Sequence, residues 1–451
     1  MHFRSKIQNF NRENFQRSSL FAIIFFSLFF MFSAGCSDSK SITPPDEPLT
    51  DTIMYLFQDG DGEWTTLDEA DFTETGIFTP VVTDSQGRYS MALVRVYGEE
   101  QEVYVTTMQT TLAEVPEIDV SSMLGINNAG TAALTVNVEG PSLPDFSVNT
   151  FYRDISRFSG TAESLTPGYF DLVLTQTESG NRYPSTLLDM RNLELVADET
   201  LVQDITTADL AGSITLSGPY TITVLDQETG DPLDSEIKRG KVKLLTSNLT
   251  FVDLGDKDDL DTDIEYTALG TPLTDADTYL LDLGIQTGVN HMLYYFAPFH
   301  DEGDLELSLT IDDFGLSFTE STGTGKLLPG MTIPDIQGVT AIGYHVGFSG
   351  NMNGISYSSR SIISAARQTG TTFIMPDLSS VTGWDTRWSI PVNAEIESTV
   401  VEAYIGSDYF LDQTSIFYYF MEISPGELYQ NMEDGDWVAI LMERISYGGP
   451  L

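Results

Sequence analysis

Short runs of β-branched and aromatic residues, each ended by a turn sequence, recur along this chain from about residue 51 onward. Residues 52–57 (TIMYLF) run into residues 59–62 (DGDG), and residues 102–108 (EVYVTTM) follow the turn-like residues 97–100 (YGEE). Such runs, bounded by Gly and Asp, are typical of antiparallel hairpins. Long helical periodicity is hard to find, so the pattern predicts an all-β fold with only short helices.

The spacing of these runs predicts several antiparallel, sandwich-like modules in tandem. Residues 305–311 (LELSLTI) alternate strictly and predict a strand with one buried and one solvated face. Residues 323–326 (GTGK) are expected to form a linker between modules. The predicted organisation is a signal peptide at residues 1–35, a lipidated cysteine and polar tether at 36–50, and β modules at 51–116, 117–205, 206–322 and 327–451.

The N-terminus carries an apolar run at residues 20–32, which follows basic residues and precedes residues 33–36 (SAGC). A helix of this run would be about 20 Å long, short of the ~30 Å hydrocarbon core, so it predicts an export signal. The segment resembles the lipobox of bacterial lipoproteins, which implies acylation of Cys36 and anchoring in the cell envelope. Ser33 stands where that family usually has leucine. Cleavage near Ala34 by an ordinary signal peptidase, giving a secreted protein, is the alternative.

The resemblance has two further implications. Aspartate directly after the cysteine can favour retention in the inner membrane in some bacteria, and Ser37 occupies that position here. We therefore expect an outer-membrane lipoprotein whose partner is the membrane, reached through the lipid anchor. Because Cys36 is the sole cysteine, no internal disulfide can form, and stability must come from sheet pairing and burial.

The chain is extremely acidic, with 21 Lys and Arg against 67 Asp and Glu and a net charge of −46. This charge repels phosphate backbones, so nucleic acid is excluded as a partner. A high-salt or marine habitat, divalent-cation binding and a cationic partner are three explanations that remain open. The one basic cluster of the mature chain, residues 238–243 (KRGKVK), is expected to form an edge strand or a solvated loop.

One segment carries a weak family likeness. Residues 165–173 (LTPGYFDLV) are similar to the turn and strand of carboxypeptidase-regulatory-like and transthyretin-like sandwiches. The resemblance implies a β-sandwich in the predicted module at 117–205, and it carries no implication for activity.

The densest acidic segment is a candidate calcium site. Asp259, Asp261 and Asp263 match the first three ligand positions of an EF-hand loop. Ile264 then replaces the required glycine, and Gly270 stands where the bidentate glutamate belongs. Two interpretations remain open: the segment binds calcium in an irregular loop, or it is a solvated loop without a metal.

Two tryptophans form the best candidate for a sugar-binding surface. Trp384 and Trp388 enclose residues 385–387 (DTR), which supply both acidic and basic hydrogen-bonding groups. A strand here would place both rings on one face. Packing in the core or between modules is the alternative.

The sequence offers little support for catalysis. The three histidines beyond the signal, His291, His300 and His345, have no metal-binding spacing, and no GxSxG motif is present. We therefore expect a non-catalytic cell-envelope lipoprotein without a cofactor, calcium aside. It would act as a binding or adhesion-type scaffold with a protein or glycan ligand. A carbohydrate-capturing surface lipoprotein is the first alternative, and a hydrolase of unrecognised type is the second.

Overall fold

The structure is a computed structural model, and Cys36, Asp259 and Asp261 lie outside the residues that it describes. The described residues are 49–120, 131–139, 146–149, 154–156, 160–165, 167–177, 183–233, 237–248, 250–256, 263–270, 277–286, 291–309, 317–323, 326–332, 341–364, 366–367, 372–373, 376–389, 395–406, 432 and 436–446.

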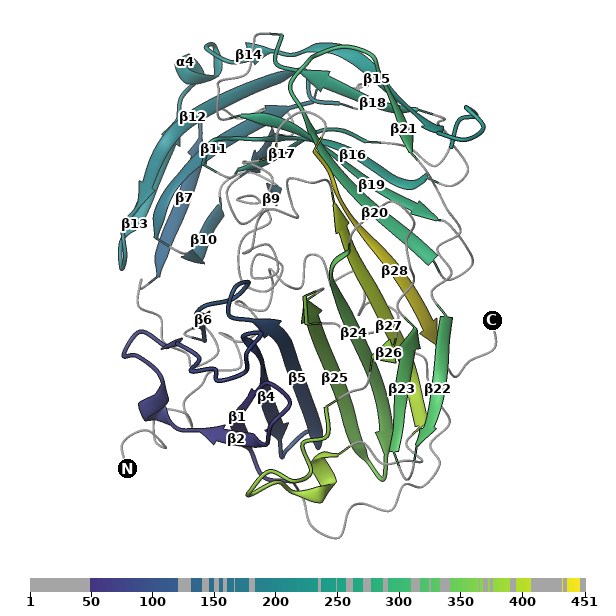
Figure 1. The fold of residues 1–451 in the computed structure, drawn as a ribbon. Coiled ribbons are helices and arrows are strands. Elements are labelled where there is room, and N and C mark those ends of the chain that lie inside the picture. The colour runs from purple at the N-terminus through teal and green to yellow at the C-terminus, as the bar shows by residue number, and fades with distance from the viewer. Residues whose placement is uncertain are drawn as a thin grey trace.

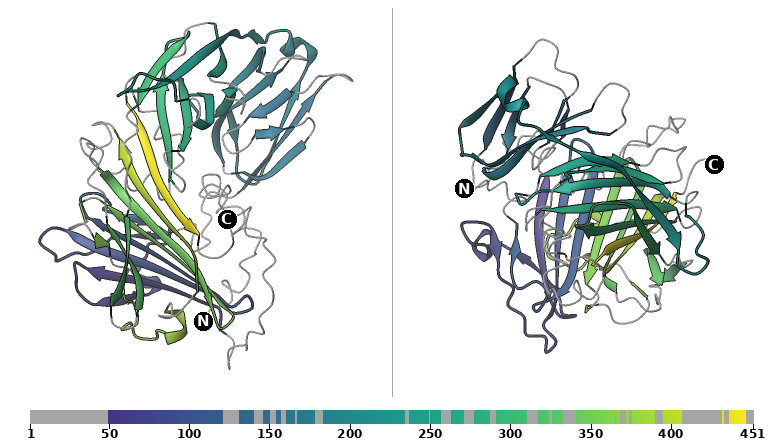
Figure 2. Two further views of the ribbon diagram at one scale, coloured as in Figure 1. Left: turned by 90° about the vertical axis from the view of Figure 1, so that its right-hand side faces the viewer. Right: turned by 90° about the horizontal axis from the view of Figure 1, so that it is seen from above.

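Fifteen described strands form one long sheet, which is strongly twisted (Figures 1 and 2). The strands, in spatial order, are β2 (Trp64–Leu67), β1 (Thr52–Asp59), β4 (Arg88–Tyr97), β5 (Glu102–Thr111), β25 (Ile355–Ser364), β24 (Ala341–Met352), β27 (Glu395–Gly406), β28 (Val438–Ser446), β20 (His291–Phe299), β19 (Thr278–Gln286), β16 (Ile237–Leu245), β17 (Phe251–Asp256), β18 (Ile264–Ala268), β15 (Ser217–Asp226) and β21 (Leu305–Leu309). The expected all-β fold class is confirmed.

Smaller sheets and three short helices complete the described fold. One sheet has the order β10 (Gly160–Leu165), β7 (Ala132–Val138), β13 (Thr200–Ile205), and another has the order β14 (Ile214–Thr215), β12 (Thr186–Leu195), β11 (Gly168–Gln176), β8 (Phe146–Asn149), β9 (Asp154–Ser156). The remaining elements are β22 (Ser317–Gly323), β23 (Lys326–Thr332), β26 (Thr372–Phe373), β3 (Ile77–Phe78), β6 (Ile118–Asp119), η1 (Glu69–Asp71), α4 (Thr207–Leu210) and η2 (Thr386–Trp388).

Strands from distant parts of the chain meet in the long sheet. β5 pairs with β25 in parallel, with Ser356 opposite Glu102, and β28 pairs antiparallel with β20. Strands from the predicted modules at 51–116, 206–322 and 327–451 therefore share one sheet, while their boundaries stay predictions. Residues 323–326, expected as a linker, instead join β22 and β23, because Gly323 is paired with Lys326 in a hairpin.

The β11 strand is buried on both faces. Phe170, Leu172 and Leu174 pack against residues of β7, β10 and β13, and Val173 belongs to the core beneath the long sheet. Successive residues of a strand point to opposite faces, so β11 contributes to both cores. The predicted strand is present from Gly168, which takes a φ of +145° at its start, while the predicted turn includes Thr166, which lies outside the described residues.

The basic cluster corrects one expectation. Residues 238–243 lie in β16, which has β17 on one side and β19 on the other, so this strand is neither an edge nor a loop. The ammonium of Lys243 and the guanidinium of Arg239 both contact the carboxylate of Asp282, at 2.9 and 2.7 Å. Cross-strand pairing with buried acid groups is what allows basic residues inside the sheet.

The alternating strand at 305–309 is confirmed. Leu305, Leu307 and Leu309 pack on the core, while Glu306 and Ser308 are exposed. β21 pairs in parallel with β15 at one end of the long sheet. Its solvated face and its place at the sheet edge explain the strict alternation that the sequence displays.

Candidate functional site

A row of side chains crosses four strands at one end of the long sheet. In the strand register Trp64 is opposite Gln58, Gln58 is opposite Ser90, and Ser90 is opposite Gln109. Residues directly opposite one another in neighbouring strands point to the same face. The fold therefore gathers one indole and two amide side chains on one face of β2, β1, β4 and β5.

Farther along these strands the same face is largely apolar and is covered. Leu56, Val94 and Val105 form a buried cluster with residues of the covering segment 376–389, including Leu378 and Val381. Trp64 packs against this cluster as a half-buried side chain. The polar row thus lies where the covered core gives way to solvent.

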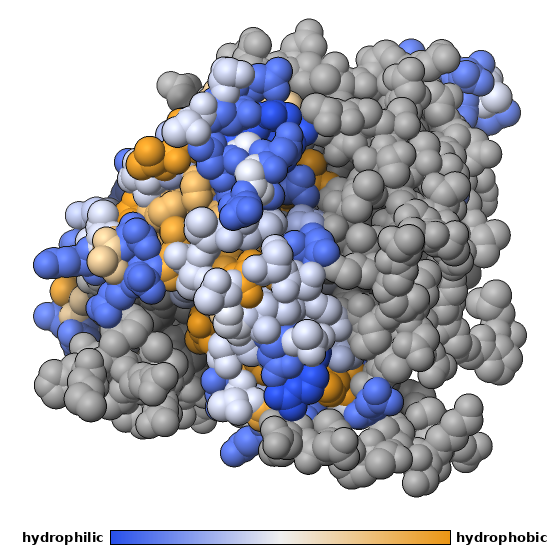
Figure 3. All heavy atoms as spheres, turned by 60° about the horizontal axis from the view of Figure 1, so that its bottom comes forward, coloured by the Kyte–Doolittle hydropathy of each residue, from blue (hydrophilic) through white to orange (hydrophobic). Residues whose placement is uncertain are grey.

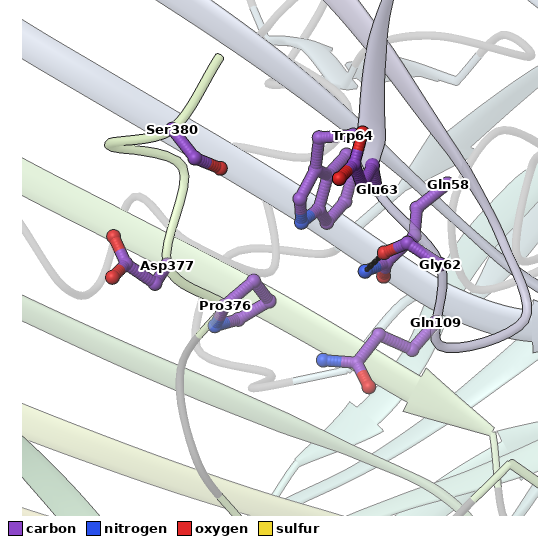
Figure 4. A pocket seen from close by; sticks show the side chains of 8 residues that line it. All are labelled: Gln58, Gly62, Glu63, Trp64, Gln109, Pro376, Asp377 and Ser380. Atoms are coloured by element: carbon purple, nitrogen blue, oxygen red, sulfur yellow. Dashed lines mark hydrogen bonds between the residues drawn. The ribbon is translucent and has the colours of Figure 1, made fainter.

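A pocket of about 330 Å³ lies beside this row. Gln58, Gly62, Glu63 and Trp64 line it from the β1–β2 hairpin, and Gln109 lines it from β5. Pro376, Asp377 and Ser380 close the opposite side (Figure 4). The Nε2 group of Gln58 donates a hydrogen bond to the carbonyl of Gly62 at 2.7 Å, which holds the amide against the turn. None of the eight lining residues is basic.

Exposed apolar residues give no comparable site. The large ones among the described residues come from separate strands and loops: Ile53, Val81, Tyr104, Tyr169, Val196, Val202 and Ile214. Figure 3 shows hydrophobic residues in small groups among polar ones on the face that it displays. Scattered apolar residues of this kind are ordinary on soluble surfaces.

The two predicted tryptophans lie in the covering segment beside this pocket. Trp388 is buried, Trp384 is half-buried, and their rings meet edge to face with centroids 5.5 Å apart. The Nε1 group of Trp384 donates to the hydroxyl of Ser389 at 2.9 Å. The residues form the short helix η2 and its flank rather than the strand considered above. Both rings pack in the buried cluster between the covering segment and the strands. Their role as a ligand platform stays a prediction.

A buried polar group lies farther along the long sheet. His345 Nδ1 is 2.9 Å from a carboxylate oxygen of Glu402, which also accepts the hydroxyl of Tyr404 at 2.8 Å. Burial lowers the pKa of His345, and this effect outweighs the rise caused by the nearby carboxylate of Glu402. Burial would raise the pKa of Glu402, but the charge and hydrogen bond of His345 and the hydroxyl of Tyr404 lower it overall. His345 is 3% exposed, which places it out of reach of a substrate.

A second buried cluster joins two sheets. The guanidinium of Arg191 on β12 makes two hydrogen bonds of 2.8 Å to the carboxylate of Asp277, which precedes β19. It also contacts Asp171 at 3.3 Å, and its Nε group donates to Asp189. The side-chain amide of Asn248 donates to Asp171 at 2.8 Å. This cluster ties the β11–β12 sheet to the long sheet.

The pKa values of two carboxyl groups in this cluster, Asp189 and Asp171, are shifted in opposite directions. Burial raises the pKa of Asp189 to about 6, against the lowering by Arg191, and Asp171 and Asp277 add to the rise. Burial would also raise the pKa of Asp171, but hydrogen bonds from Asn248, Thr246 and the Asn192 amide, with the Arg191 charge, lower it overall. In this cluster the carboxylates of Asp171 and Asp277 are engaged by Arg191 and by amide donors.

Metal and membrane features are limited to what the described residues show. Asp263 accepts the hydroxyl of Thr223 at 3.1 Å. Because Asp259 and Asp261 lie outside the described residues, calcium binding stays a prediction. Within the described ranges, no three His, Cys, Asp or Glu side chains converge as metal ligands. No helix in that part of the chain combines the length and apolarity needed to cross a membrane.

Sequence reasoning missed the pocket residues, although part of the signal was available. Gln58 and Trp64 are placed symmetrically about residues 60–62, so a hairpin register pairs them. Gln109 and residues 376–380 reach the same place only through tertiary packing, and no local pattern marks them.

Comparison with known proteins gives little guidance. No protein-family model matches the chain, and no curated protein matches it either. Among solved structures, the TIE protein of Bacillus anthracis aligns with 78% of this chain and 62% of its own, at 9% identity and a TM-score of 0.16. The chain thus spans less than two thirds of that protein's length. A candidate adhesin from Bacteroides ovatus aligns with 45% of this chain and 93% of its own, at 7% identity and a TM-score of 0.14. At these TM-scores neither likeness bears on function.

Proposed function

We propose that this chain is a non-catalytic cell-envelope lipoprotein that acts as a binding or adhesion-type scaffold. Lipidation at Cys36 would anchor it to the membrane, with the outer membrane as the expected location. The observation that carries the binding role is the open pocket beside Trp64, which lies at one end of the long sheet. A polar recess beside a half-buried indole suits the capture of a ligand.

The first described residues support an anchor and tether before the fold. Leu49 is buried, and its N–H group donates to the side chain of Gln101 at 3.2 Å. A Cβ at Gly98 would lie 2.4 Å from the carbonyl of Leu49, so only glycine permits this close approach. Leu49 is therefore held against the β4–β5 turn.

The pocket chemistry favours binding over hydrolysis. A glycosidase needs a general acid whose pKa is raised by an apolar, buried setting. The two carboxylates that line the pocket, Glu63 and Asp377, are exposed to solvent. The buried pair of His345 and Glu402 is enclosed in the sheet and is turned toward Tyr404. These features support a scaffold role.

Labelling with a palmitate analogue tests the anchor. We expect the wild-type protein to incorporate label and to partition into detergent, whereas Cys36→Ser is unlabelled. A matched Ser37→Ala variant should keep the label. An unlabelled, secreted wild-type protein would support cleavage near Ala34 instead and would remove the anchor from the proposal.

Binding is tested with the full-length protein in detergent, with and without calcium, on arrays of proteins and on intact cells. Retention by a protein or cell surface supports the scaffold. The absence of any retention, together with turnover of a hydrolase substrate, would overturn it in favour of an enzyme.

A further inference from the structure

The pocket beside Trp64 has a composition that defines a ligand class. We propose that it binds one neutral sugar unit of a glycan, with the indole of Trp64 as the stacking surface. The amides of Gln58 and Gln109 would hydrogen-bond the sugar hydroxyl groups. The inference rests on the proposed scaffold function, because it names the ligand of that scaffold.

The indole is held in place before a ligand arrives. Trp64 packs against the covered cluster that contains Leu378 and Val381, and it also lines the pocket. Its partner in the strand register, Gln58, is fixed to the carbonyl of Gly62. A rigid aromatic ring loses little conformational entropy on binding, so its contact area contributes efficiently to affinity.

The polar groups match hydroxyl-rich ligands. Side-chain amides both donate and accept hydrogen bonds, and the hydroxyl of Ser380 and the carboxylate of Asp377 extend this capacity across the pocket. Figure 4 shows Gln109, Pro376 and Trp64 around one shared space. A sugar ring presents both requirements at once, since its C–H face packs on an indole while its hydroxyl groups point to the rim.

Charge excludes acidic ligands. The pocket lining includes Glu63 and Asp377 and no basic residue, and the whole chain carries −46. A phosphate, a sulfate or a uronic acid would be repelled and would find no cation to pair with. An acidic ligand is therefore excluded.

The volume of the recess suits a small ligand unit such as a single sugar ring. The volume of about 330 Å³ lies at the lower end of ligand pockets, which span roughly 300–1,000 Å³. Because Glu63, Asp377 and Ser380 are exposed at the rim, the rest of a glycan could extend into solvent.

A quaternary ammonium ligand is the main rival. Trp64 could face such a cation, and Glu63 and Asp377 could balance its charge. Cages for these ligands use several aromatic rings, whereas this pocket lining contains one. The two amides also have no role toward a cation that lacks hydrogen-bond donors. The composition therefore favours the sugar.

The test uses full-length protein in a detergent without a sugar headgroup. Neutral mono- and oligosaccharides built from glucose, galactose, mannose and N-acetylglucosamine are screened on an array, and positive ligands are titrated by calorimetry. We expect Trp64→Ala to weaken binding at least tenfold and Gln109→Ala to weaken it several-fold. Trp437→Phe is the matched control, because Trp437 stacks on Tyr295 elsewhere in the fold. It should leave the affinity unchanged.

Fluorescence keeps the proposal testable if Trp64→Ala does not fold. The chain has four tryptophans, so a sugar on Trp64 should alter the emission. Trp64→Phe should remove this change and retain the apolar packing. Trp384→Phe should leave the change in place, and its loss in that variant would move the ligand to the tryptophan pair predicted from the sequence.

The outcomes separate this inference from the function on which it rests. If the protein binds none of the neutral glycans but is still retained by cells or proteins, the sugar site is overturned and the scaffold function is still supported. Glycan binding that Trp64→Ala and Gln109→Ala do not weaken also overturns the site. If choline binds at Trp64 and the sugars do not, the pocket is a cation site and the sugar proposal is overturned. If the protein binds no glycan, no protein and no cell surface, both proposals are overturned.

Discussion

Two polar clusters of this molecule use similar side chains in opposite ways. Around Arg191 the carboxylates of Asp171 and Asp277 are buried and are directed at a cation and at amide donors. Around Trp64 the amides and carboxylates border an open recess. The first cluster is closed because two sheets meet there, whereas the second borders solvent, with Glu63, Asp377 and Ser380 exposed around it. Polar residues therefore indicate a binding site only where the fold leaves their hydrogen-bonding capacity facing solvent.

The largest expected effect is at the closed cluster. Arg191→Met would leave Asp171 and Asp277, which are 0% and 1% exposed, without their cation. We expect the free energy of unfolding to fall by about 3–5 kcal/mol, as is typical when one partner of a buried ion pair is removed. Urea titration followed by circular dichroism measures the change.

Lys241→Met is the control for Arg191→Met, since Lys241 pairs with the exposed carboxylate of Asp253. It should cost at most about 1 kcal/mol. Equal losses in the two variants would contradict the distinction between a structural cluster and surface charge.

The next effect is at the buried pair of His345 and Glu402. Glu402→Gln weakens the hydrogen bonds to His345 and Tyr404, and we expect a loss of about 2 kcal/mol at pH 7. Because the pKa values of both His345 and Glu402 are lowered in the fold, the unfolded chain binds more protons. Stability should fall as the pH drops below 6.5 for His345 and below 4.5 for Glu402.

The matching measurement compares wild type and Glu402→Gln across this pH range. The gap between them should narrow below about pH 4.5, where wild-type Glu402 loses its advantage. Glu306→Gln, an exposed change on β21, should show no such convergence. A constant gap would mean that ionisation of Glu402 does not contribute.

A smaller effect of opposite sign is expected at Asp189. Its pKa is raised to about 6, so keeping it ionised costs stability at neutral pH, and the cost disappears as the pH falls toward 3.8. Asp189→Asn should be neutral or stabilising by about 1 kcal/mol at pH 7.5. The advantage should vanish near pH 4. A larger loss at pH 7.5 than at pH 4 would show that the contact with Arg191 outweighs the repulsion.

The smallest effect on stability belongs to the open pocket. Gln109→Ala should change the free energy of unfolding by less than about 0.5 kcal/mol, because the side chain borders solvent. Thr107 lies two residues away on the same face of β5, and its hydroxyl is buried and donates to Ser361 at 2.8 Å. Thr107→Ala should therefore cost about 1 kcal/mol. Equal losses would make Gln109 a structural residue.

Local sequence patterns predicted several strands and a hairpin of the fold. The hairpin around residues 59–62, the strand from Gly168 and the alternating strand at 305–309 all lie where their patterns predict, because turn chemistry and side-chain alternation act over a few residues. The basic strand at 238–243 was placed wrongly at an edge. Its charges are balanced by Asp282 from the neighbouring strand, and no local pattern reveals that partner.

The candidate site was only partly within reach of the sequence. The tryptophan pair was visible as a motif, whereas its packing into the cover depends on Leu378, Val381 and the strands beneath. The pocket needs Gln109 from β5 and residues 376–380, which are more than 260 residues apart in the chain. Such contacts are decided by which strands pair, and β-strand patterns carry little information about the identity of a partner.

By itself, the sequence determined an acidic, all-β chain and predicted an exported protein with an acylated Cys36. Composition, periodicity and the N-terminal motif are local properties that need no partner. Only the tertiary structure decided that β5 joins β25, and that one sheet therefore unites strands from both ends of the chain. Only the tertiary structure packs residues 376–389 against β1, β4 and β5 and brings Pro376, Asp377 and Ser380 to the pocket beside Trp64. The physical reason is that backbone hydrogen bonds can join any two compatible strands, and burial of the shared apolar face selects between them.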